Sequence, residues 1–307
     1  MEQIYDVIII GAGPAGLTAA IYARRAELSV LIIERYTPGG QILNTYEVDN
    51  YPGLPGISGV DLGTRMSEHA DKFSPDRVMA EVEKIDFAEG AHVVVTDAGN
   101  FTGRTLILAT GNSARKLGIP GEEELIGSGV SYCATCDGAF YKGVDVAVIG
   151  GGDVAVEDAI FLSRGCRKVY LVHRRDELRA TKVLQTALLN TPNIIPVWNS
   201  VALQIFGEDE GEVTGLKIAD VKSGEERELD VTGVFIAIGH NPNSSYLDAI
   251  DKDEKGYLIA DESCATSVPG VYAAGDIRRK RLRQVSTAVA DGANAVYSIE
   301  SYIATQM

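Results

Sequence analysis

The sequence is poor in basic residues, and it contains no long apolar run. Lysine and arginine number 28 against 43 aspartates and glutamates, which gives a formal net charge of −15 at pH 7. Phosphate groups would be repelled over most of such a surface, which argues against nucleic acid and anionic membranes as main partners. No apolar stretch approaches the roughly 20 residues of a membrane-spanning helix. The acidic start, Met1–Asp6, also lacks the basic region of a secretory signal, so we expect a cytoplasmic protein.

Cysteine and histidine are also scarce, with four of each in 307 residues. Four cysteines are too few for a structural disulfide framework, and in a reducing compartment a disulfide is more often catalytic. A zinc site needs four ligands, but the histidines are scattered at positions 69, 92, 173 and 240, and Cys166 and Cys264 stand alone. We therefore expect no metal, and we interpret the two isolated thiols as packed in the interior.

The other two cysteines, Cys133 and Cys136, form a pair separated by two residues and followed directly by Asp137. Two thiols at this spacing can close and open a disulfide with little backbone movement, which is redox chemistry if something supplies electrons. Asp137 can serve as a general acid if burial raises its pKa, or it can cap the helix that follows the motif. The pair and its acid are the candidate catalytic residues.

A dinucleotide-binding fingerprint occurs before this pair. An apolar strand over residues 6–10 ends in Gly-Ala-Gly-Pro-Ala-Gly at 11–16, which opens into a helix over 17–26. A second strand, 29–33, closes with Glu34. The glycines allow a tight turn and let the backbone approach a pyrophosphate at the helix N-terminus, and the acid binds ribose hydroxyls. Glu34 could instead merely cap the strand on the surface.

A second fingerprint follows about 140 residues later, so the chain holds either two cofactors or one degenerate copy. A strand over 144–149 precedes Gly-Gly-Gly-Asp-Val-Ala at 150–155, a helix extends to Ser163, and a strand over 168–172 ends in His-Arg-Arg. Arginine at this position suits a ribose 2′-phosphate, which an acid would repel. The pattern predicts FAD in the first site and NADPH in the second, although a solvated charge run is the alternative for Arg174 and Arg175.

The remaining elements alternate in the way expected of an α/β protein with two Rossmann-like domains. We expect a helix over 60–73, strands over 81–87, 92–96 and 104–109 with a turn at 98–100, and a strand-rich segment over 197–229 with turns at 208–211 and 223–224. The chain is expected to cross between the domains at 112–121 and, after a strand over 233–239, again at 240–243. A strand is expected over 270–276, and the last helix covers 284–302. The sequence predicts an FAD domain made of 1–113 and 242–307, with an NADPH domain inserted at 114–241. We interpret the basic run Arg278–Arg283 mainly as a solvated or docking face.

In this order the motifs resemble the low-molecular-weight thioredoxin reductases, over nearly the whole chain. The shared motifs are the two fingerprints, Gly39-Gly40-Gln41, Ala109-Thr110-Gly111, Cys133-Ala134-Thr135-Cys136-Asp137-Gly138, His173-Arg174-Arg175 with Arg179, and Ala274-Gly275-Asp276 with Arg283-Gln284. The resemblance implies a homodimer that passes electrons from NADPH through FAD and the disulfide to thioredoxin. It also implies that Cys136 faces the flavin, Cys133 attacks the protein substrate and Asp137 is the general acid.

Two sets of cofactor residues follow. The residues expected to bind FAD are Gly11, Gly13, Pro14, Ala15, Gly16, Glu34, Gly40, Gln41, Asn50, Thr110, Gly111, Gly275, Asp276, Arg283, Gln284 and Val285. Those expected to bind NADPH are Gly150, Gly152, Asp153, Val154, Ala155, His173, Arg174, Arg175 and Arg179.

The chain departs from the family pattern at two places. Val154 replaces a small hydroxyl residue in the second glycine turn, which removes a side-chain contact to pyrophosphate but leaves the backbone N–H groups. Ala139 replaces one of two aromatic residues before Tyr141, which bears on how thioredoxin would dock. Two other functions stay open: a flavin disulfide reductase or oxidase for another dithiol protein or small disulfide, and a redox sensor without turnover.

Overall fold

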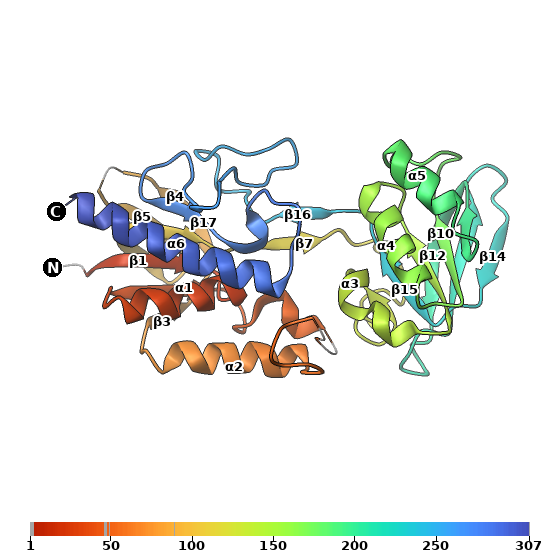
Figure 1. Ribbon diagram of the computed structural model, residues 1–307, viewed down its shortest axis with the longest axis horizontal. Helices are drawn as coiled ribbons and strands as arrows, with labels where there is room; N and C mark the ends of the chain where they lie inside the picture. Colours follow the sequence, from red (N-terminus) through yellow and green to blue (C-terminus); the bar gives the residue numbers. More distant parts are fainter. Residues whose placement is uncertain (1–2, 46–47, 49, 89, 307) are drawn as a thin grey trace. The chain divides into compact units, whose positions relative to one another are not determined.

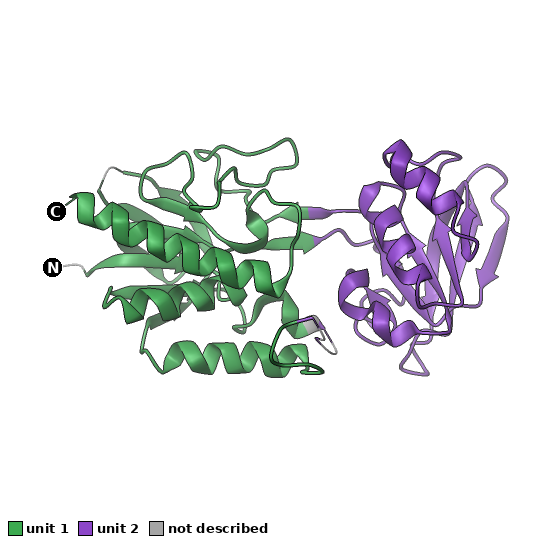
Figure 2. Cartoon of the chain, in the orientation of Figure 1, with its two compact units in different colours: residues 1–43, 51–113, 241–307 green, residues 44–50, 114–240 purple. Residues whose placement is uncertain are grey.

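The computed structural model describes residues 3–45, 48, 50–88 and 90–306 and divides into two compact units (Figures 1 and 2). Unit 1 comprises Met1–Leu43, Tyr51–Ser113 and Asn241–Met307, and unit 2 comprises Asn44–Asn50 and Ala114–His240. Apart from the short segment 44–50, unit 2 is one continuous stretch inserted into unit 1. The sequence-based boundaries therefore differ from the observed ones by that segment and by residue 241.

Unit 1 is built on a seven-stranded sheet in the order β3-β2-β1-β6-β5-β4, with β17 also pairing with β6. The strands are β1 (Ile4–Ile10), β2 (Val30–Glu34), β3 (Asp76–Met79), β4 (Val82–Asp86), β5 (His92–Thr96), β6 (Gly99–Leu108) and β17 (Val271–Ala273). The helices are α1 (Pro14–Arg25), η1 (Gly40–Asn44), α2 (Gly59–Asp71), η3 (Gly275–Ile277) and α6 (Val285–Gln306). Strands β3, β2, β1, β6 and β17 are parallel, and β4 and β5 extend the sheet in antiparallel fashion.

Both faces of this sheet are buried, which explains why its central strands are continuous apolar runs. Val7 and Ile9 of β1 point into a core shared with α1 and α6, where alanines such as Ala19 allow the two helices to approach closely. Ile8 and Ile10 point into the opposite core, which residues such as Leu258 cover. Figure 1 shows α1 and α6 on the same face of the sheet.

Unit 2 has a parallel sheet of five strands, in the order β11-β10-β9-β15-β8, and an antiparallel sheet of three, β12-β13-β14. The strands are β8 (Val130–Ser131), β9 (Asp145–Ile149), β10 (Lys168–Val172), β11 (Ile194–Val197), β12 (Ser200–Phe206), β13 (Gly215–Asp220), β14 (Glu226–Leu229) and β15 (Gly233–Ile236). The helices are α3 (Ala134–Asp137), η2 (Gly138–Tyr141), α4 (Asp153–Ser163) and α5 (Lys182–Leu189). The helices pack on one face of the parallel sheet, and the three-stranded sheet packs on the other.

The two crossings pair with each other as a two-stranded sheet of β7 (Asn112–Ala114) and β16 (His240–Pro242). The predicted elements are confirmed in kind, and their bounds shift by a few residues. The turn predicted at 98–100 lies earlier, because Gly99 already pairs with Thr96 and only Asp97 and Ala98 form the hairpin loop. The strand predicted over 270–276 is shorter, since Gly275 starts the 3₁₀ turn η3.

Candidate active site

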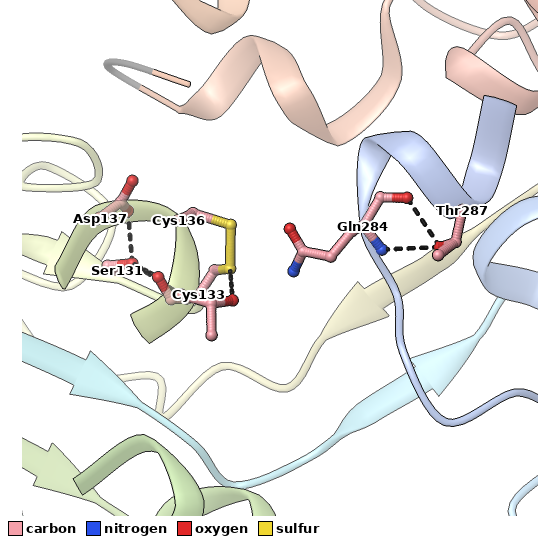
Figure 3. Close-up of a disulfide and its surroundings, with 7 residues drawn as sticks. Ser131, Cys133, Cys136, Asp137, Gln284 and Thr287 are labelled. Carbon is pink, nitrogen blue, oxygen red and sulfur yellow. Dashed lines mark hydrogen bonds between the residues drawn. A yellow bond between two sulfur atoms is a disulfide. The ribbon is translucent and has the colours of Figure 1, made fainter. Parts of the chain in front are cut away.

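The two cysteines of the Cys-x-x-Cys motif form a disulfide at the start of α3 (Figure 3). The Cα atoms of Cys133 and Cys136 lie 5.3 Å apart. The Cys133 carbonyl oxygen accepts hydrogen bonds from the N–H groups of Cys136 at 3.2 Å and Asp137 at 3.1 Å, which makes one tight helical turn. Both cysteines are half-buried. The turn holds the sulfurs together through local backbone bonds, so the disulfide can open without unfolding its surroundings.

Asp137 lies beside this disulfide and has one hydrogen-bond partner for its side chain. Ser131 Oγ donates to Asp137 Oδ2 at 2.6 Å, whereas Oδ1 is buried without a partner among the described residues. Burial raises the pKa of Asp137, and the hydrogen bond from Ser131 partly offsets the rise. The alternative that the Asp137 side chain caps the next helix is wrong, since it makes no capping bond to η2. Its environment favours the protonated acid.

The sequence did not single out the residues that support this turn. Ser131 is buried on β8, and its Oγ also accepts the Cys133 N–H at 3.0 Å. Glu122 is buried as well: it accepts the hydroxyl of Tyr132 at 2.8 Å and the N–H groups of Leu117 and Gly118. Glu122 therefore ties the entering chain to the residue before Cys133. In the sequence Glu122 belongs to a run of acidic residues that would be expected to face solvent. Its burial therefore cannot be predicted from the neighbouring residues.

Close backbone contacts shape the first glycine fingerprint. A Cβ on Gly11, which has φ +106°, would lie 2.3 Å from the Ala109 carbonyl oxygen, and a Cβ on Gly16 would lie 1.9 Å from the Gly11 carbonyl oxygen. No side chain caps the N-terminus of α1, and Pro14 occupies its first turn. Its backbone N–H groups are thus available to an anion.

Glu34, at the end of β2, is bonded to this turn. Its Oε2 accepts the Ala12 N–H at 2.6 Å and its Oε1 accepts the Tyr36 N–H at 3.0 Å. It therefore fixes the glycine turn in addition to any contact with a ribose, and the alternative of a strand cap that only faces solvent is wrong. Its role as a ribose ligand stays a prediction.

The C-terminal segment brings Gly275 and Asp276 to the same place. Gly275 has φ +78°, and a Cβ on it would lie 2.9 Å from the Cβ of Ala15 at the start of α1. Burial raises the pKa of Asp276. Arg283 donates from Nε to the Asp276 carbonyl oxygen at 3.2 Å and lies 3.9 Å from the ring centre of Tyr257. Residues far apart in sequence thus form one backbone-lined cradle.

Two members of the basic run form ion pairs with a buried acid. Arg278 and Lys280 pair with the buried Asp291 of α6 at 2.7 and 2.9 Å, and Asp291 also accepts the Gly275 N–H at 2.9 Å. The interpretation of a solvated face is therefore right for Arg279 and Arg281, which are exposed, and wrong for the paired residues. A buried carboxylate requires such partners.

The other predicted FAD residues surround the ends of β6, η1 and α6. Gln41 Nε2 donates to the backbone oxygen and to Oδ1 of Asn112. Gly40 has φ +67° and its Cβ would lie 3.0 Å from the Gly13 Cα. Thr110 exchanges hydrogen bonds with Asn243, and Gly111 has φ +66°. The backbone of Gln284, which precedes Val285, forms hydrogen bonds with the Thr287 hydroxyl (Figure 3). Asn50 is exposed and is grouped with unit 2.

The second fingerprint, in unit 2, is equally crowded. A Cβ on Gly150 would lie 2.5 Å from the Ala237 carbonyl oxygen, and one on Gly151 would lie 2.2 Å from Nδ1 of His173. Gly152, by contrast, faces open space at the N-terminus of α4. Asp153 Oδ1 accepts the Thr181 N–H at 2.7 Å. The backbone at Gly152 has no side chain on its solvent side, which suits a pyrophosphate. The next residues of the fingerprint are the exposed Val154 and the buried Ala155.

Three arginines lie around this turn, and His173 lies beneath it. Arg174, Arg175 and Arg179 are exposed, and none forms an ion pair within the described part of the chain. The Arg179 N–H donates to the Gly151 carbonyl oxygen at 2.8 Å, which ties this residue to the glycine turn. His173 is buried, and its Nε2 lies 3.1 Å from the Glu177 carbonyl oxygen. Burial is the main reason that its pKa is lowered, which favours the neutral ring.

The two isolated thiols are not candidate nucleophiles. Burial raises the pKa of Cys166 to about 11 and that of Cys264 to about 12, so both buried thiols stay protonated, which confirms that they are packed. Among the described residues no cluster of histidine, cysteine and acidic side chains could hold a metal ion. Each described helix is too short or too polar to span a bilayer.

Comparison with known proteins decides the family. The model of the pyridine nucleotide-disulphide oxidoreductases matches residues 5–292 of the chain. The chain belongs to this family. It is therefore an oxidoreductase. Thioredoxin reductases in this family use FAD and NADPH and have two Rossmann-like domains, which confirms the predicted cofactor pair and the predicted fold.

The relatives of this pyridine nucleotide-disulphide oxidoreductase are similar over almost their whole length. The thioredoxin reductases of Bacillus subtilis (strain 168) and Listeria monocytogenes are each 45% identical to this chain. The alignments span 98% of this chain and 96% and 95% of the two relatives, respectively. A solved thioredoxin reductase from Streptococcus pyogenes is 44% identical with a TM-score of 0.94, covering 99% of this chain and 100% of that one. The resemblance to low-molecular-weight thioredoxin reductases is thereby confirmed.

Proposed function

We propose that this enzyme reduces the disulfide of a thioredoxin at the expense of NADPH, through FAD and the Cys133–Cys136 disulfide. The observation that carries the proposal is the disulfide on a one-turn helix beside a buried acid, in the same unit as the arginine-flanked nucleotide turn. The similarity to proteins named thioredoxin reductase supports thioredoxin as the substrate. The net reaction converts the thioredoxin disulfide, NADPH and one proton into a dithiol and NADP⁺.

The residues of unit 1 fit an FAD molecule. The crowded glycines at 11, 16 and 275 leave no room for side chains, so backbone N–H groups of α1 can meet a pyrophosphate, and Glu34 can accept from ribose hydroxyls. Bound FAD would supply two-electron chemistry between a nicotinamide and a disulfide. The chain's own part is to hold this group and to shield it from water.

The two sulfurs have separate tasks in the proposal. Cys136, next to the acid, receives the electrons from the cofactor side, and Cys133 attacks the disulfide of the protein substrate to form a mixed disulfide. Asp137 holds the proton that a released thiolate needs, since burial favours its neutral form. The family resemblance also supports a cytoplasmic homodimer, for which sedimentation should give twice the chain mass.

The arginines around the second fingerprint should select NADPH. Replacing Arg174 and Arg175 together by alanine should raise the KM for NADPH by about 10- to 100-fold, because charge-assisted bonds to the 2′-phosphate are lost. The KM for NADH, which lacks this phosphate, should stay the same. Steady-state kinetics with both nucleotides measures the difference, with Arg227→Ala, an exposed arginine of β14, as the matched control. Equal losses with both nucleotides would refute the assignment.

The substrate is tested by direct comparison. With NADPH and no oxygen, thioredoxin reduction should show a kcat/KM within the usual enzyme range of about 10⁴–10⁸ M⁻¹s⁻¹. A small disulfide should be a much poorer substrate, because it does not dock to the protein surface, and oxygen uptake in air serves as the control for electron leakage. If a small disulfide is turned over efficiently and thioredoxin is not, the enzyme is a reductase for another dithiol.

A further inference from the structure

Ser131 is buried on β8, directly beneath the redox turn, and its hydroxyl makes two short hydrogen bonds. Its Oγ lies 2.6 Å from Asp137 Oδ2 and 3.0 Å from the Cys133 backbone nitrogen (Figure 3). The contact with the Cys133 carbonyl oxygen is longer, at 3.4 Å. One small side chain thus joins the general acid to the backbone of the attacking cysteine.

The direction of these bonds follows from the number of protons. The Cys133 nitrogen has a hydrogen and no lone pair to offer, so Ser131 Oγ must accept there. The single hydroxyl hydrogen is then free to point to the nearest remaining acceptor, Asp137 Oδ2. With Ser131 donating, Oδ2 is an acceptor. The opposite arrangement, in which a protonated Oδ2 donates to the second lone pair of Ser131 Oγ, would leave the hydroxyl hydrogen with only the longer contact of 3.4 Å to the Cys133 carbonyl oxygen.

The other carboxyl oxygen remains. Asp137 Oδ1 is buried and has no partner among the described residues. A buried carboxylate with an unpaired oxygen is costly, and protonation of the carboxyl group removes its charge. Because Oδ2 accepts the Ser131 hydroxyl, the proton of the neutral acid lies on Oδ1.

We propose that Ser131 is a positioning residue that fixes the Asp137 carboxyl so that Oδ1 carries the transferable proton. This inference deepens the proposed function and rests on it. Opening the Cys133–Cys136 disulfide takes two electrons from the oxidation of NADPH to NADP⁺ and leaves a sulfur that needs a proton. In the oxidised structure no described residue forms a hydrogen bond with Oδ1, so its proton reaches the sulfur only after the reduced turn or the carboxyl group moves. Asp137 is then a carboxylate stabilised by the Ser131 hydroxyl, and it regains a proton from solvent.

Few other charged groups act on Asp137. Cys136 lies on the same helix, α3, and Cys133 directly precedes it; both titrate only when the disulfide is reduced. Tyr141 of η2 stays neutral, because burial above all, together with the charge of Asp137, raises its pKa to about 12. β8 contributes the Ser131 hydroxyl, and the acids Glu157 and Asp158 of α4 are not among the causes that shift the pKa of Asp137. Ser131 is thus the main polar influence on the acid.

The test is infrared spectroscopy of the oxidised holoenzyme over a range of pH, without NADPH or thioredoxin. The band of the protonated carboxyl group of Asp137 is assigned by its loss in Asp137→Asn. In the wild type it should lie at the frequency of a hydrogen-bonded carbonyl. In Ser131→Ala it should move to higher frequency, and its titration midpoint should rise by about one to two pH units, because the bond that stabilises the carboxylate is lost.

Matched variants separate positioning from folding. Ser131→Thr keeps the hydroxyl and should restore the wild-type midpoint, and Ser163→Ala, which removes a hydroxyl bonded to the Ile160 carbonyl oxygen, should change neither band nor midpoint. A wild-type band at the frequency of a free carbonyl would overturn the proposal even if Ser131→Ala did not fold. An unchanged band and midpoint in folded Ser131→Ala would overturn it too. Neither result depends on thioredoxin reduction, so the proposed function would still stand.

Discussion

Replacing either Cys133 or Cys136 by serine should abolish thioredoxin reduction, with a loss of about 10⁴-fold or more, the order of loss seen when an enzyme loses its nucleophile. A serine oxygen cannot form the disulfide with the remaining sulfur, so the chain can neither store the electrons nor pass them to a protein substrate. NADPH-driven reduction of thioredoxin, followed under anaerobic conditions, measures the loss. The fold should be intact, because α3 is held by backbone bonds to the Cys133 carbonyl oxygen that the substitutions leave in place.

The control for this prediction is Cys166→Ala. Cys166 is buried, and its raised pKa, about 11, keeps the thiol neutral and unreactive. This variant should keep thioredoxin reduction and lose only some stability, on the order of 1 kcal/mol. Normal thioredoxin reduction by either active-site serine variant would be incompatible with the proposed path of electrons.

Substituting Gly16 by alanine should eliminate FAD binding and destabilise unit 1. The new Cβ would lie 1.9 Å from the Gly11 carbonyl oxygen and 3.2 Å from the Ile9 side chain, so the turn and the start of α1 must separate. The backbone contact cannot give way as a flexible side chain would, so we expect a cost of more than about 4 kcal/mol. The ratio of flavin to protein absorbance in the purified protein, with a thermal melt, measures both effects.

Gly165→Ala is the matched control for this substitution. Its Cβ would have nothing within 4 Å, and Gly165 has no left-handed backbone conformation. It should therefore keep its flavin and its melting temperature. Full flavin content in the Gly16 variant would show that the first fingerprint does not hold FAD in the way we describe.

The sequence predicted the two nucleotide turns well, because their signals are local. Glycine between a buried strand and a helix usually indicates a tight turn. Gly11 and Gly150 both form such a turn, close to the end of a neighbouring strand. The parallel strands are recognisable because both faces are buried, which requires continuous apolar runs. The spacing of Cys133 and Cys136 likewise determines a single turn.

What the sequence missed depends on contacts between distant segments. Arg278 and Lys280 look like a solvated run, and only the approach of Asp291 from α6 makes them a buried ion-pair cluster. Glu122 similarly looks exposed until Tyr132 and the entering chain close around it. Ser131 is an ordinary strand residue in sequence. Its importance comes from where Asp137 lies after the helical turn.

An anaerobic titration with NADPH tests the central claim most directly. The purified yellow enzyme should take up four electrons per chain, two for the flavin and two for the Cys133–Cys136 disulfide, and the Cys136→Ser variant should take up only two. An uptake of two electrons by the wild type would contradict the account, because the disulfide would then not be in electronic contact with the flavin.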